Sequence, residues 1–339
     1  MVEIGKIRDK TLVLNGGYIS IFRGGKLIWK KCYMPYTLPD GNIYWYRRRV
    51  RITELSGNTL TDYQIKIEIE AGDPIFAHAR SAGEDIRFCY YPEAKMIPHW
   101  IEKYDPVAEE AIIWVKVPEI PANSEIEIYM YYGNPEVASA SDGFAVFDFF
   151  DDFEDGDVSD WYNNECGIFE ARTTTAFQGN YSIFIDDPAD SCDERVYHDF
   201  PQDFTFDLIL EGAVYISAWS IQIGVDPVDL WFNRNGKGSD TIDNVWATLP
   251  GDGCPSGQWR EFRIAYLYSQ QKILVWRDWV EGLEGTPWEY TDSRITGPAK
   301  KVWLGLHNYG KGAGYFDLIK VRKYASPEPS VSLGAEEAI

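Results

Sequence analysis

The chain has 339 residues and a formal net charge of −21, from 53 acidic and 32 basic residues. Hydrophobic residues make up 45% and aromatic residues 15% of the chain, so it can bury folded cores and is not expected to be disordered. Its length suggests two domains. The acidic balance argues against nucleic acid as a partner, and no apolar run reaches the roughly 18 residues of a membrane span, so we expect no membrane insertion.

Residues 1–41 are predicted to form an N-terminal hairpin arm. Two short apolar runs, Ile19–Phe22 and Leu27–Trp29, flank Gly24 and Gly25, and glycine readily adopts the positive φ of a two-residue turn. A lone hairpin is marginally stable in water, so the arm should pack on the next domain or on a partner. The segment lacks the apolar stretch and cleavage site of a signal peptide, so we expect a trimmed chain or export by another route.

Residues 42–137 show the pattern of a β-sandwich. Ile65, Ile67 and Ile69 alternate with polar residues, as in a strand with one buried face. Further strands are expected at 85–91, 97–103, 111–117 and 125–132, with Gly, Pro and Asn between them. Regular short strands separated by turn residues predict an antiparallel sandwich.

One strand of this region has a basic face. Arg47, Arg49 and Arg51 occupy alternate positions, so they share one side of the strand. We interpret them as a solvated strand face that also discourages edge-to-edge aggregation, and an anionic partner is the alternative.

The remainder of the chain is also predicted to be β-structure. Residues 138–143 are small and polar and are interpreted as a linker. Residues 144–325 contain strand patterns throughout and have the length of a two-sheet jelly roll. Residues 326–339 are predicted to be an extended tail.

Seven short words in the first domain carry a resemblance to a known family. They are Trp45–Ile52, Leu60–Ile65, Glu84–Phe88, Ile97–Glu102, Ile113–Pro118, Ile128–Pro135 and Ser139–Gly143. Together they cover nearly all of residues 42–145, and they resemble a domain family of unknown function found in archaeal and bacterial surface proteins. One departure is local, because Cys89–Ala94 replaces the usual short polar turn.

The second domain resembles the concanavalin A-like, laminin-G-like jelly rolls that commonly follow this family. Phe149–Gly156 with Trp161, Gly257–Trp259 and Tyr315–Tyr324 carry the resemblance. The predicted fold class is therefore all-β, with two antiparallel β-sandwich domains, the second a concanavalin A-like jelly roll, and an N-terminal hairpin arm. The resemblance also implies surface display and carbohydrate binding, although one fold hosts many functions.

The same resemblance implies one structural calcium ion. Related jelly rolls often hold calcium between their first and last strands, which makes Glu154, Asp155 and Asp317 the candidate ligands. Calcium takes six to eight oxygen ligands, and an acidic segment supplies them. The segment lacks the spacing of an EF-hand. The alternative is a solvated acidic loop with a strand-end Asp that accepts hydrogen bonds from the backbone.

An alternating stretch near the C-terminal end of the jelly roll is the candidate ligand site. Val302, Leu304 and Leu306 should face the core. Sugars need aromatic platforms beside hydrogen-bonding groups, and the opposite face and its rim offer them. The predicted ligand-binding residues are Trp303, His307, Asn308 and Tyr309, and further aromatic candidates are Trp219, Trp231, Trp276, Trp279 and Trp288. Packing is the alternative for each of them, and Trp259 is expected in the core.

The sequence contains none of the catalytic motifs that we searched for. The zinc motif H-E-x-x-H, the nucleophile motif G-x-S-x-G and the Glu-x-Asp-x-x-Glu word of jelly-roll glycosidases are all missing. We therefore expect no enzyme, and a polysaccharide-cleaving activity is a minor alternative. The five Cys are odd in number and sparse, so most are interpreted as thiols, with a Cys166–Cys192 bridge left open.

These observations favour a non-enzymatic, surface-displayed adhesion protein whose jelly roll binds a glycan or cell-surface polysaccharide. The alternative is a structural subunit of a virion appendage or extracellular filament. In that case a homo-oligomer or an appendage partner would assemble through residues 1–40 by strand addition. The expected location is extracellular, at a cell surface or on a virion.

Overall fold

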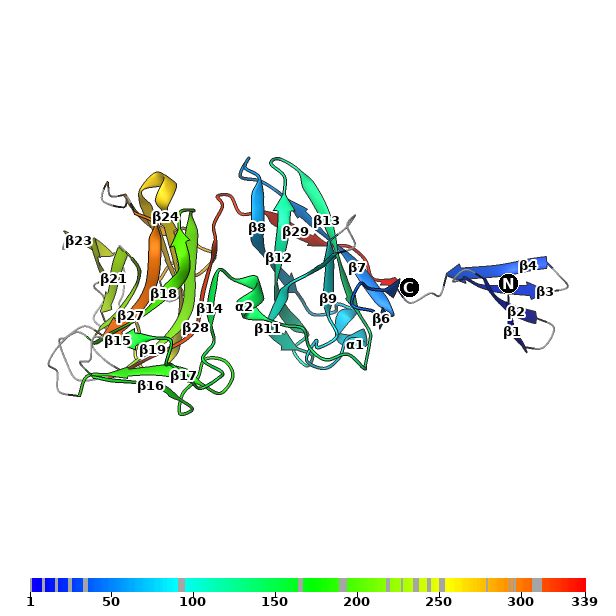
Figure 1. Ribbon diagram of the computed structural model, residues 1–339, viewed down its shortest axis with the longest axis horizontal. Coiled ribbons are helices and arrows are strands. Elements are labelled where there is room, and N and C mark those ends of the chain that lie inside the picture. Colours follow the sequence, from blue (N-terminus) through cyan, green and yellow to red (C-terminus); the bar gives the residue numbers. More distant parts are fainter. Residues whose placement is uncertain are drawn as a thin grey trace. The chain divides into compact units, whose positions relative to one another are not determined.

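The computed structural model confirms that the chain is almost entirely β-structure (Figure 1). It describes residues 2–7, 10–15, 18–23, 26–32, 36–90, 95–163, 167–188, 194–217, 220–226, 228–233, 238–242, 245–249, 254–278, 280–291, 293, 295, 297–306 and 313–339, with backbone only in 2–36, at 220 and 229, and in 231–249. The chain divides into two compact units, Met1–Val146 with Pro327–Ile339, and Phe147–Ser326. Among the described residues, no helix has the length and apolarity needed to cross a bilayer.

The N-terminal arm is a sheet of its own. Its antiparallel strands are β1 (Val2–Ile7), β2 (Lys10–Asn15), β3 (Tyr18–Arg23) and β4 (Lys26–Cys32), in the order β1-β2-β3-β4. The predicted hairpin at Gly24 and Gly25 is the β3–β4 pair. The prediction missed the two preceding strands, β1 and β2.

The first unit is a sandwich of a six-stranded and a three-stranded sheet. The larger sheet has the order β10-β9-β13-β7-β29, with β30 also on β7, and the smaller has the order β11-β12-β8. Its elements are β5 (Tyr36–Thr37), β6 (Ile43–Tyr44), β7 (Tyr46–Thr53), β8 (Leu60–Ile69), α1 (Ile75–His78), β9 (Arg87–Tyr90), β10 (Lys95–Ile97), β11 (His99–Asp105), β12 (Glu110–Ile120), β13 (Glu125–Tyr132) and α2 (Gly143–Val146). Ile65, Ile67 and Ile69 are buried, as their alternation predicts.

The C-terminal segment differs from the predicted tail, because it completes the first unit. Strands β29 (Ser330–Leu333) and β30 (Glu337–Ala338) both pair with β7. Glu336 accepts a hydrogen bond of 2.7 Å from the Tyr132 hydroxyl, and its Oε2 lies 2.9 Å from Nδ1 of His78. The jelly roll is therefore inserted into the sequence of the first unit, between α2 and β29.

The basic face of β7 is neutralised within its own sheet. Arg51 lies 3.1 Å from Glu127 on β13, and Arg47 lies 2.8 Å from Glu337 on β30. Arg49 lies between the same two carboxylates, at 3.9 and 3.6 Å. This cross-strand ladder supports the interpretation of a solvated strand face, and such exposed pairs add little stability.

The second unit is a two-sheet jelly roll. An eight-stranded sheet has the order β16-β17-β28-β19-β24-β25-β26 with β14 on β28, and a seven-stranded sheet has the order β15-β18-β27-β20-β21-β22-β23. Its elements are β14 (Phe149–Asp151), β15 (Tyr162–Asn163), β16 (Ile168–Arg172), β17 (Ser182–Asp186), β18 (Glu194–Phe204), β19 (Leu208–Ile216), β20 (Ser220–Val225), β21 (Val228–Asn233), β22 (Gly238–Ile242), β23 (Val245–Leu249), β24 (Trp259–Leu267), η1 (Tyr268–Gln270), β25 (Lys272–Arg277), β26 (Trp288–Thr291), β27 (Ala299–Leu306) and β28 (Ala313–Lys323). Cys254 in this unit and Cys89 in the first are buried free thiols, whereas Cys166 and Cys192 lie outside the described residues.

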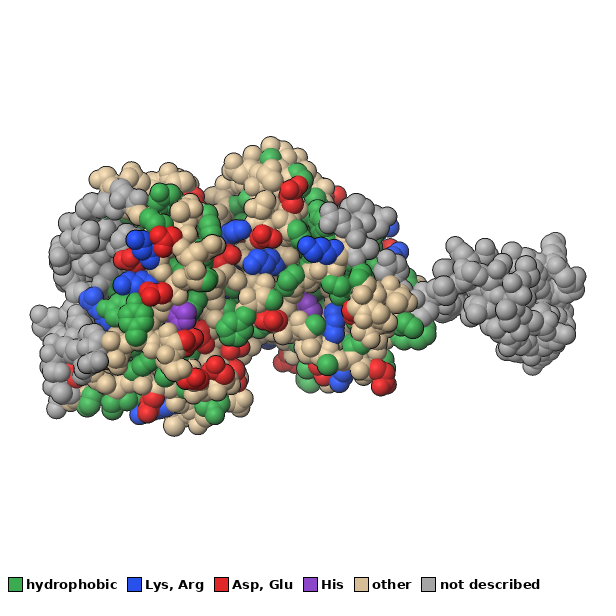
Figure 2. All heavy atoms as spheres, in the orientation of Figure 1, with side chains coloured by type: hydrophobic (Ala, Val, Ile, Leu, Met, Phe, Trp, Pro, Cys, Tyr) green, Lys and Arg blue, Asp and Glu red, His purple; other side chains and the backbone are tan. Residues whose placement is uncertain are grey.

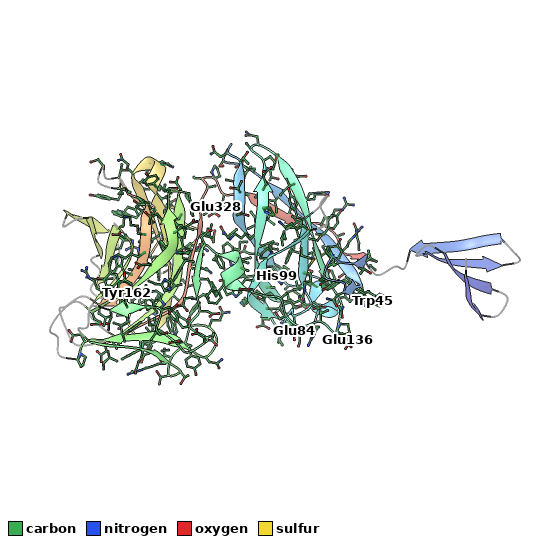
Figure 3. The ribbon with its side chains drawn as sticks, viewed as in Figure 1. Trp45, Glu84, His99, Glu136, Tyr162 and Glu328 are labelled. Atoms are coloured by element: carbon green, nitrogen blue, oxygen red, sulfur yellow. The ribbon has the colours of Figure 1, made fainter. Side chains whose placement is uncertain are left out.

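Residues 138–143, predicted to be a linker, form hydrogen bonds with β11 of the first unit. Ser141 forms a parallel bridge with His99, its hydroxyl accepts a hydrogen bond of 2.8 Å from the Ile101 amide, and the Asp142 amide donates to the His99 carbonyl at 2.9 Å. His99, which Figure 3 labels in the first unit, is 2% exposed, and its Nε2 has no hydrogen-bond partner. Burial, reinforced by the positive charge of Arg87, lowers the pKa of His99 to about 3.

We predict that His99 makes the first unit sensitive to acid. The fold accommodates only the neutral ring, whereas the unfolded chain takes up a proton near pH 6.5. The stability that this neutral ring provides is therefore complete above pH 6.5. It is lost by roughly 1.4 kcal/mol per pH unit as the pH falls towards the folded-state pKa. Urea unfolding of wild type and His99→Gln across this range measures the difference, and parallel pH profiles for the two proteins would refute the assignment.

Candidate functional site

Four aromatic residues lie at one register level on the outward face of the eight-stranded sheet. Phe184 on β17 pairs with Tyr315 on β28, Tyr315 with Tyr215 on β19, and Tyr215 with Trp259 on β24. The successive ring centroids are 5.0, 5.8 and 5.9 Å apart. We call these four residues the aromatic row.

Strand alternation explains why the row faces outward. Neighbours such as Ile183, Val214 and Phe316 fill the core between the two sheets, so Phe184, Tyr215 and Tyr315 must lie on the other side. The rings meet at 57–86°, which is the tilted or edge-to-face geometry that aromatic pairs favour. The prediction that Trp259 lies in the core is wrong, because Trp259 is half-buried in this row. On β24 the even-numbered residues Phe262 and Ile264 face the core, so the odd-numbered position 259 faces outward.

A fifth ring lies beside Trp259. The loop of residues 173–181 connects β16 to β17 and carries Phe177, whose ring centroid lies 5.8 Å from that of Trp259. Phe177 is 37% exposed, whereas Phe184 at the opposite end is 4% exposed and lies 3.4 Å beneath the Arg172 guanidinium. The accessible part of the row is therefore the end with Phe177, Trp259 and Tyr215.

Two carboxylates fix the loop that carries Phe177. Asp317 Oδ2 accepts hydrogen bonds from the amides of Phe177 at 2.7 Å and Gln178 at 3.1 Å. Glu154 Oε1 accepts from the amides of Asn180 at 2.7 Å and Tyr181 at 2.8 Å. Two side chains thus satisfy four backbone donors of one loop: Asp317 from β28, and Glu154 from the turn that follows β14.

Gly179 shows how closely the loop approaches Glu154. Its φ is +67°, a conformation that side chains rarely adopt, and a Cβ at this position would collide with the Glu154 carboxylate. The position therefore requires glycine on both grounds.

Three residues were predicted as calcium ligands: Glu154, Asp155 and Asp317. The structure brings Glu154 and Asp317 to the same loop, whereas Asp155 does not join them. Asp317 Oδ1 is buried and has no hydrogen-bond partner, and burial raises the pKa of Asp317 to about 7. Asp155 instead accepts a 2.9 Å hydrogen bond from the Asp157 amide in an exposed turn. Among the residues that the structure describes, no three His, Cys, Asp or Glu side chains are arranged to hold a metal ion. The carboxylate set thus falls short of a full site, and calcium stays a prediction that rests on Asp317 Oδ1.

The predicted sugar platform lies on the seven-stranded sheet. Val302, Leu304 and Leu306 are in the core, as predicted. Trp303 is on the outward face but only 5% exposed, because the Arg195 guanidinium lies 5.3 Å from its ring and Gly224 lies directly against it. The other predicted ligand residues, His307, Asn308 and Tyr309, lie outside the described residues, so this site stays a prediction.

A second aromatic pair lies on that outward face and was missed by sequence reasoning. Tyr162 stacks on Tyr197 with centroids 5.4 Å apart and donates a 3.0 Å hydrogen bond to Asp199. Burial and this carboxylate raise the pKa of Tyr162 to about 12, although the ring is 45% exposed. Figure 3 labels Tyr162 at the surface, and Figure 2 shows hydrophobic side chains there among charged ones. The alternation of Arg195, Tyr197 and Asp199 was the signal available in the sequence.

Comparison with known proteins identifies a family match and several solved folds. A profile described as "Domain of unknown function (DUF2341)" matches residues 82–164, which overlaps the resemblance found over 42–145. No curated protein sequence matches the chain significantly.

Three solved structures illustrate the fold similarity. "Cellulose induced protein, Cip1" is 18% identical with a TM-score of 0.41, covering 52% of this chain and 97% of that one. An endo-beta-1,4-glucuronan lyase from Trichoderma reesei is 13% identical with a TM-score of 0.39, covering 52% and 96%. The CBM22-1 xylan-binding domain of Xyn10C from Paenibacillus barcinonensis is 11% identical with a TM-score of 0.31, covering 52% and 94%. At these values the similarities carry no information on function.

We predict that calcium stabilises the second unit through Asp317. A cation beside Oδ1 would offset the cost of burying this carboxylate, so added calcium should raise the melting temperature of wild type. Asp317→Asn should abolish the increase while keeping an oxygen for the loop amides, and Asp157→Asn, in the exposed acidic turn, should respond like wild type. Calorimetry in calcium and in chelator provides the measurement, and identical melting curves for wild type would rule the site out.

Proposed function

We propose that the protein binds carbohydrate without transforming it, and that the exposed end of the aromatic row is the contact surface. The observation that carries this proposal is the grouping of three aromatic rings, those of Tyr215, Trp259 and Phe177. Tyr215 and Trp259 pair on adjacent strands, and a loop held by Asp317 places Phe177 beside Trp259. A pyranose ring has an apolar C–H face that packs on aromatic rings and polar edges that need hydrogen bonds. The partly exposed rings at this end of the row suit that combination.

The shape of the row favours a chain of sugar units over a single sugar. At its accessible end, Tyr215 and Trp259 lie on adjacent strands about 4.8 Å apart. Phe177 adds a third ring there, with its centroid 5.8 Å from that of Trp259. A linear polysaccharide could therefore contact several rings at once.

The carboxylates beside the row support binding rather than turnover. A glycoside hydrolase needs one carboxyl group positioned as an acid and a second as a base or nucleophile. Here Asp317 and Glu154 accept hydrogen bonds from loop amides, so their role is to hold the loop. This arrangement supports a non-enzymatic protein, in line with the missing catalytic words.

The biological setting is proposed from the family resemblance. A protein that binds polysaccharide and resembles surface proteins fits an adhesion role at a cell surface, in the extracellular space or on a virion. The alternative, a structural subunit of a virion appendage or filament, is favoured by one observation. The N-terminal arm forms a four-stranded sheet that can serve assembly separately from the jelly roll.

We predict that the aromatic row carries the affinity for glycan. Truncating a ring at the centre of a binding surface costs about 2 kcal/mol, so Trp259→Ala should weaken binding by roughly tenfold or more. Tyr215→Ala should act in the same direction. A polysaccharide array followed by affinity electrophoresis measures both effects.

The matched control is Tyr162→Ala, which removes an exposed ring from the other sheet. Unchanged melting temperatures would show that the variants fold. If Tyr162→Ala abolishes binding and Trp259→Ala does not, the ligand lies on the seven-stranded sheet. If wild type binds no polysaccharide, the carbohydrate function itself is wrong.

A further inference from the structure

The register level on one side of the aromatic row is acidic. Asp317 on β28 pairs with Ala213 on β19, and Ala213 pairs with Glu261 on β24. Each of these positions is two residues along its strand from a member of the row, so it shares the outward face of the row. Glu261 is half-buried and is on the same strand as Trp259, at the accessible end.

Two further acidic residues lie towards the covered end of the row. Glu170 on β16 pairs with Phe184 and so continues the register level of the row. Asp186 is two residues from Phe184 on β17 and shares its face. The row and the levels on either side of it thus hold four acidic side chains. Among the strand positions that the structure describes there, Arg172 is the only basic one.

The guanidinium groups near the row on this face already have carboxylate partners. Arg172 lies 2.6 Å from Glu170. Arg263, two residues beyond Glu261 on β24, lies 3.4 Å from Glu211 and 3.1 Å from Glu284. Neither group therefore supplies the counter-charge that an anionic ligand on the row would need.

We infer that the row selects uncharged polysaccharides over polysaccharides that carry carboxylate or sulfate groups. An acidic sugar bound on the rings of Tyr215, Trp259 and Phe177 would lie beside Glu261 and Asp317, and bringing like charges together weakens binding. The hydroxyl groups of a neutral sugar can instead donate hydrogen bonds to carboxylate oxygens. This inference rests on the proposed function and specifies the class of its ligand.

The carboxylates beside the row, rather than the net charge of the whole chain, are expected to set this preference. At an ionic strength of about 0.1 M the Debye length is roughly 10 Å, so distant charges are largely screened. Glu289 is such a distant charge on the same sheet. It pairs with Leu274, and Leu274 pairs with Ala265, which is six residues or about 20 Å along β24 from Trp259.

The test uses the full-length chain and two derivatives of one polymer. The uncharged polysaccharide that binds most tightly on an array is converted to its hydroxyethyl and carboxymethyl derivatives, which are similar in size and differ in charge. Affinity electrophoresis at about 0.1 M salt should show wild type binding the carboxymethyl derivative at least tenfold more weakly than the hydroxyethyl derivative. At about 0.5 M salt this difference should shrink at least threefold, because salt screens the repulsion.

Two variants locate the charge that is responsible. Glu261→Gln should reduce the difference between the two derivatives at least threefold at about 0.1 M salt, with little change in affinity for the hydroxyethyl derivative. Glu289→Gln removes the same charge far from the row and should leave the difference as in wild type. Unchanged melting temperatures would show that both variants fold.

The outcomes separate this inference from the proposed function. If wild type binds both derivatives equally, or if acidic polymers alone bind, carbohydrate binding stands and the inferred preference is wrong. If Glu261→Gln and Glu289→Gln change the difference equally, the net charge sets the preference and the role of the acidic residues beside the row is refuted. If no polysaccharide binds, the proposed function fails and this inference fails with it.

Discussion

The buried carboxylate of Asp317 is the constraint on which the proposed binding surface depends. It lies where β28 bulges opposite β19, and the next residue, Leu318, has a φ of +54°. Burying a carboxylate is costly unless hydrogen bonds or a cation compensate it, and here two loop amides do so on one oxygen. Those amides belong to Phe177 and the residue after it, so the same interaction that offsets the burial also places an aromatic ring beside Trp259.

The return of the chain to the first unit is a second organising feature. β29 and β30 add to β7 some 280 residues after β7 itself, as the separations between paired residues show. Both ends of the jelly roll are thereby attached to one sandwich. We expect pairing between such distant segments to form late in folding, because the loop must close before any contact compensates the lost entropy. The hydrogen bonds of Glu336 and the Arg47–Glu337 pair hold the closing segment in place.

Local patterns predicted much of the architecture. The alternation of Ile65, Ile67 and Ile69, and of Val302, Leu304 and Leu306, identified the core faces of two strands because burial has period two. The C-terminal strands were missed, because Val331 and Leu333 form a short signal whose partner is distant in sequence. No local sequence pattern distinguishes a C-terminal strand that pairs with its own domain from an extended tail.

The candidate site was less accessible to sequence reasoning. Phe184, Tyr215, Trp259 and Tyr315 each look like an ordinary strand residue, and only the register of four strands brings them into line. The resemblance to related jelly rolls also implied Asp155 as a calcium ligand, but this residue lies in an exposed turn and accepts a hydrogen bond from the Asp157 amide. Glu154 and Asp317 do meet at one loop, but through backbone amides that the sequence could not reveal.

Amide hydrogen exchange over residues 177–181 tests most directly whether these carboxylates make the loop a fixed part of the surface. We expect the amides of Phe177, Gln178, Asn180 and Tyr181 to exchange slowly, with protection approaching that of the adjoining strands. Asp317→Ala should expose the first two to rapid exchange. Rapid exchange of all four amides in wild type would show that the loop is not held, and the aromatic surface as described would not exist.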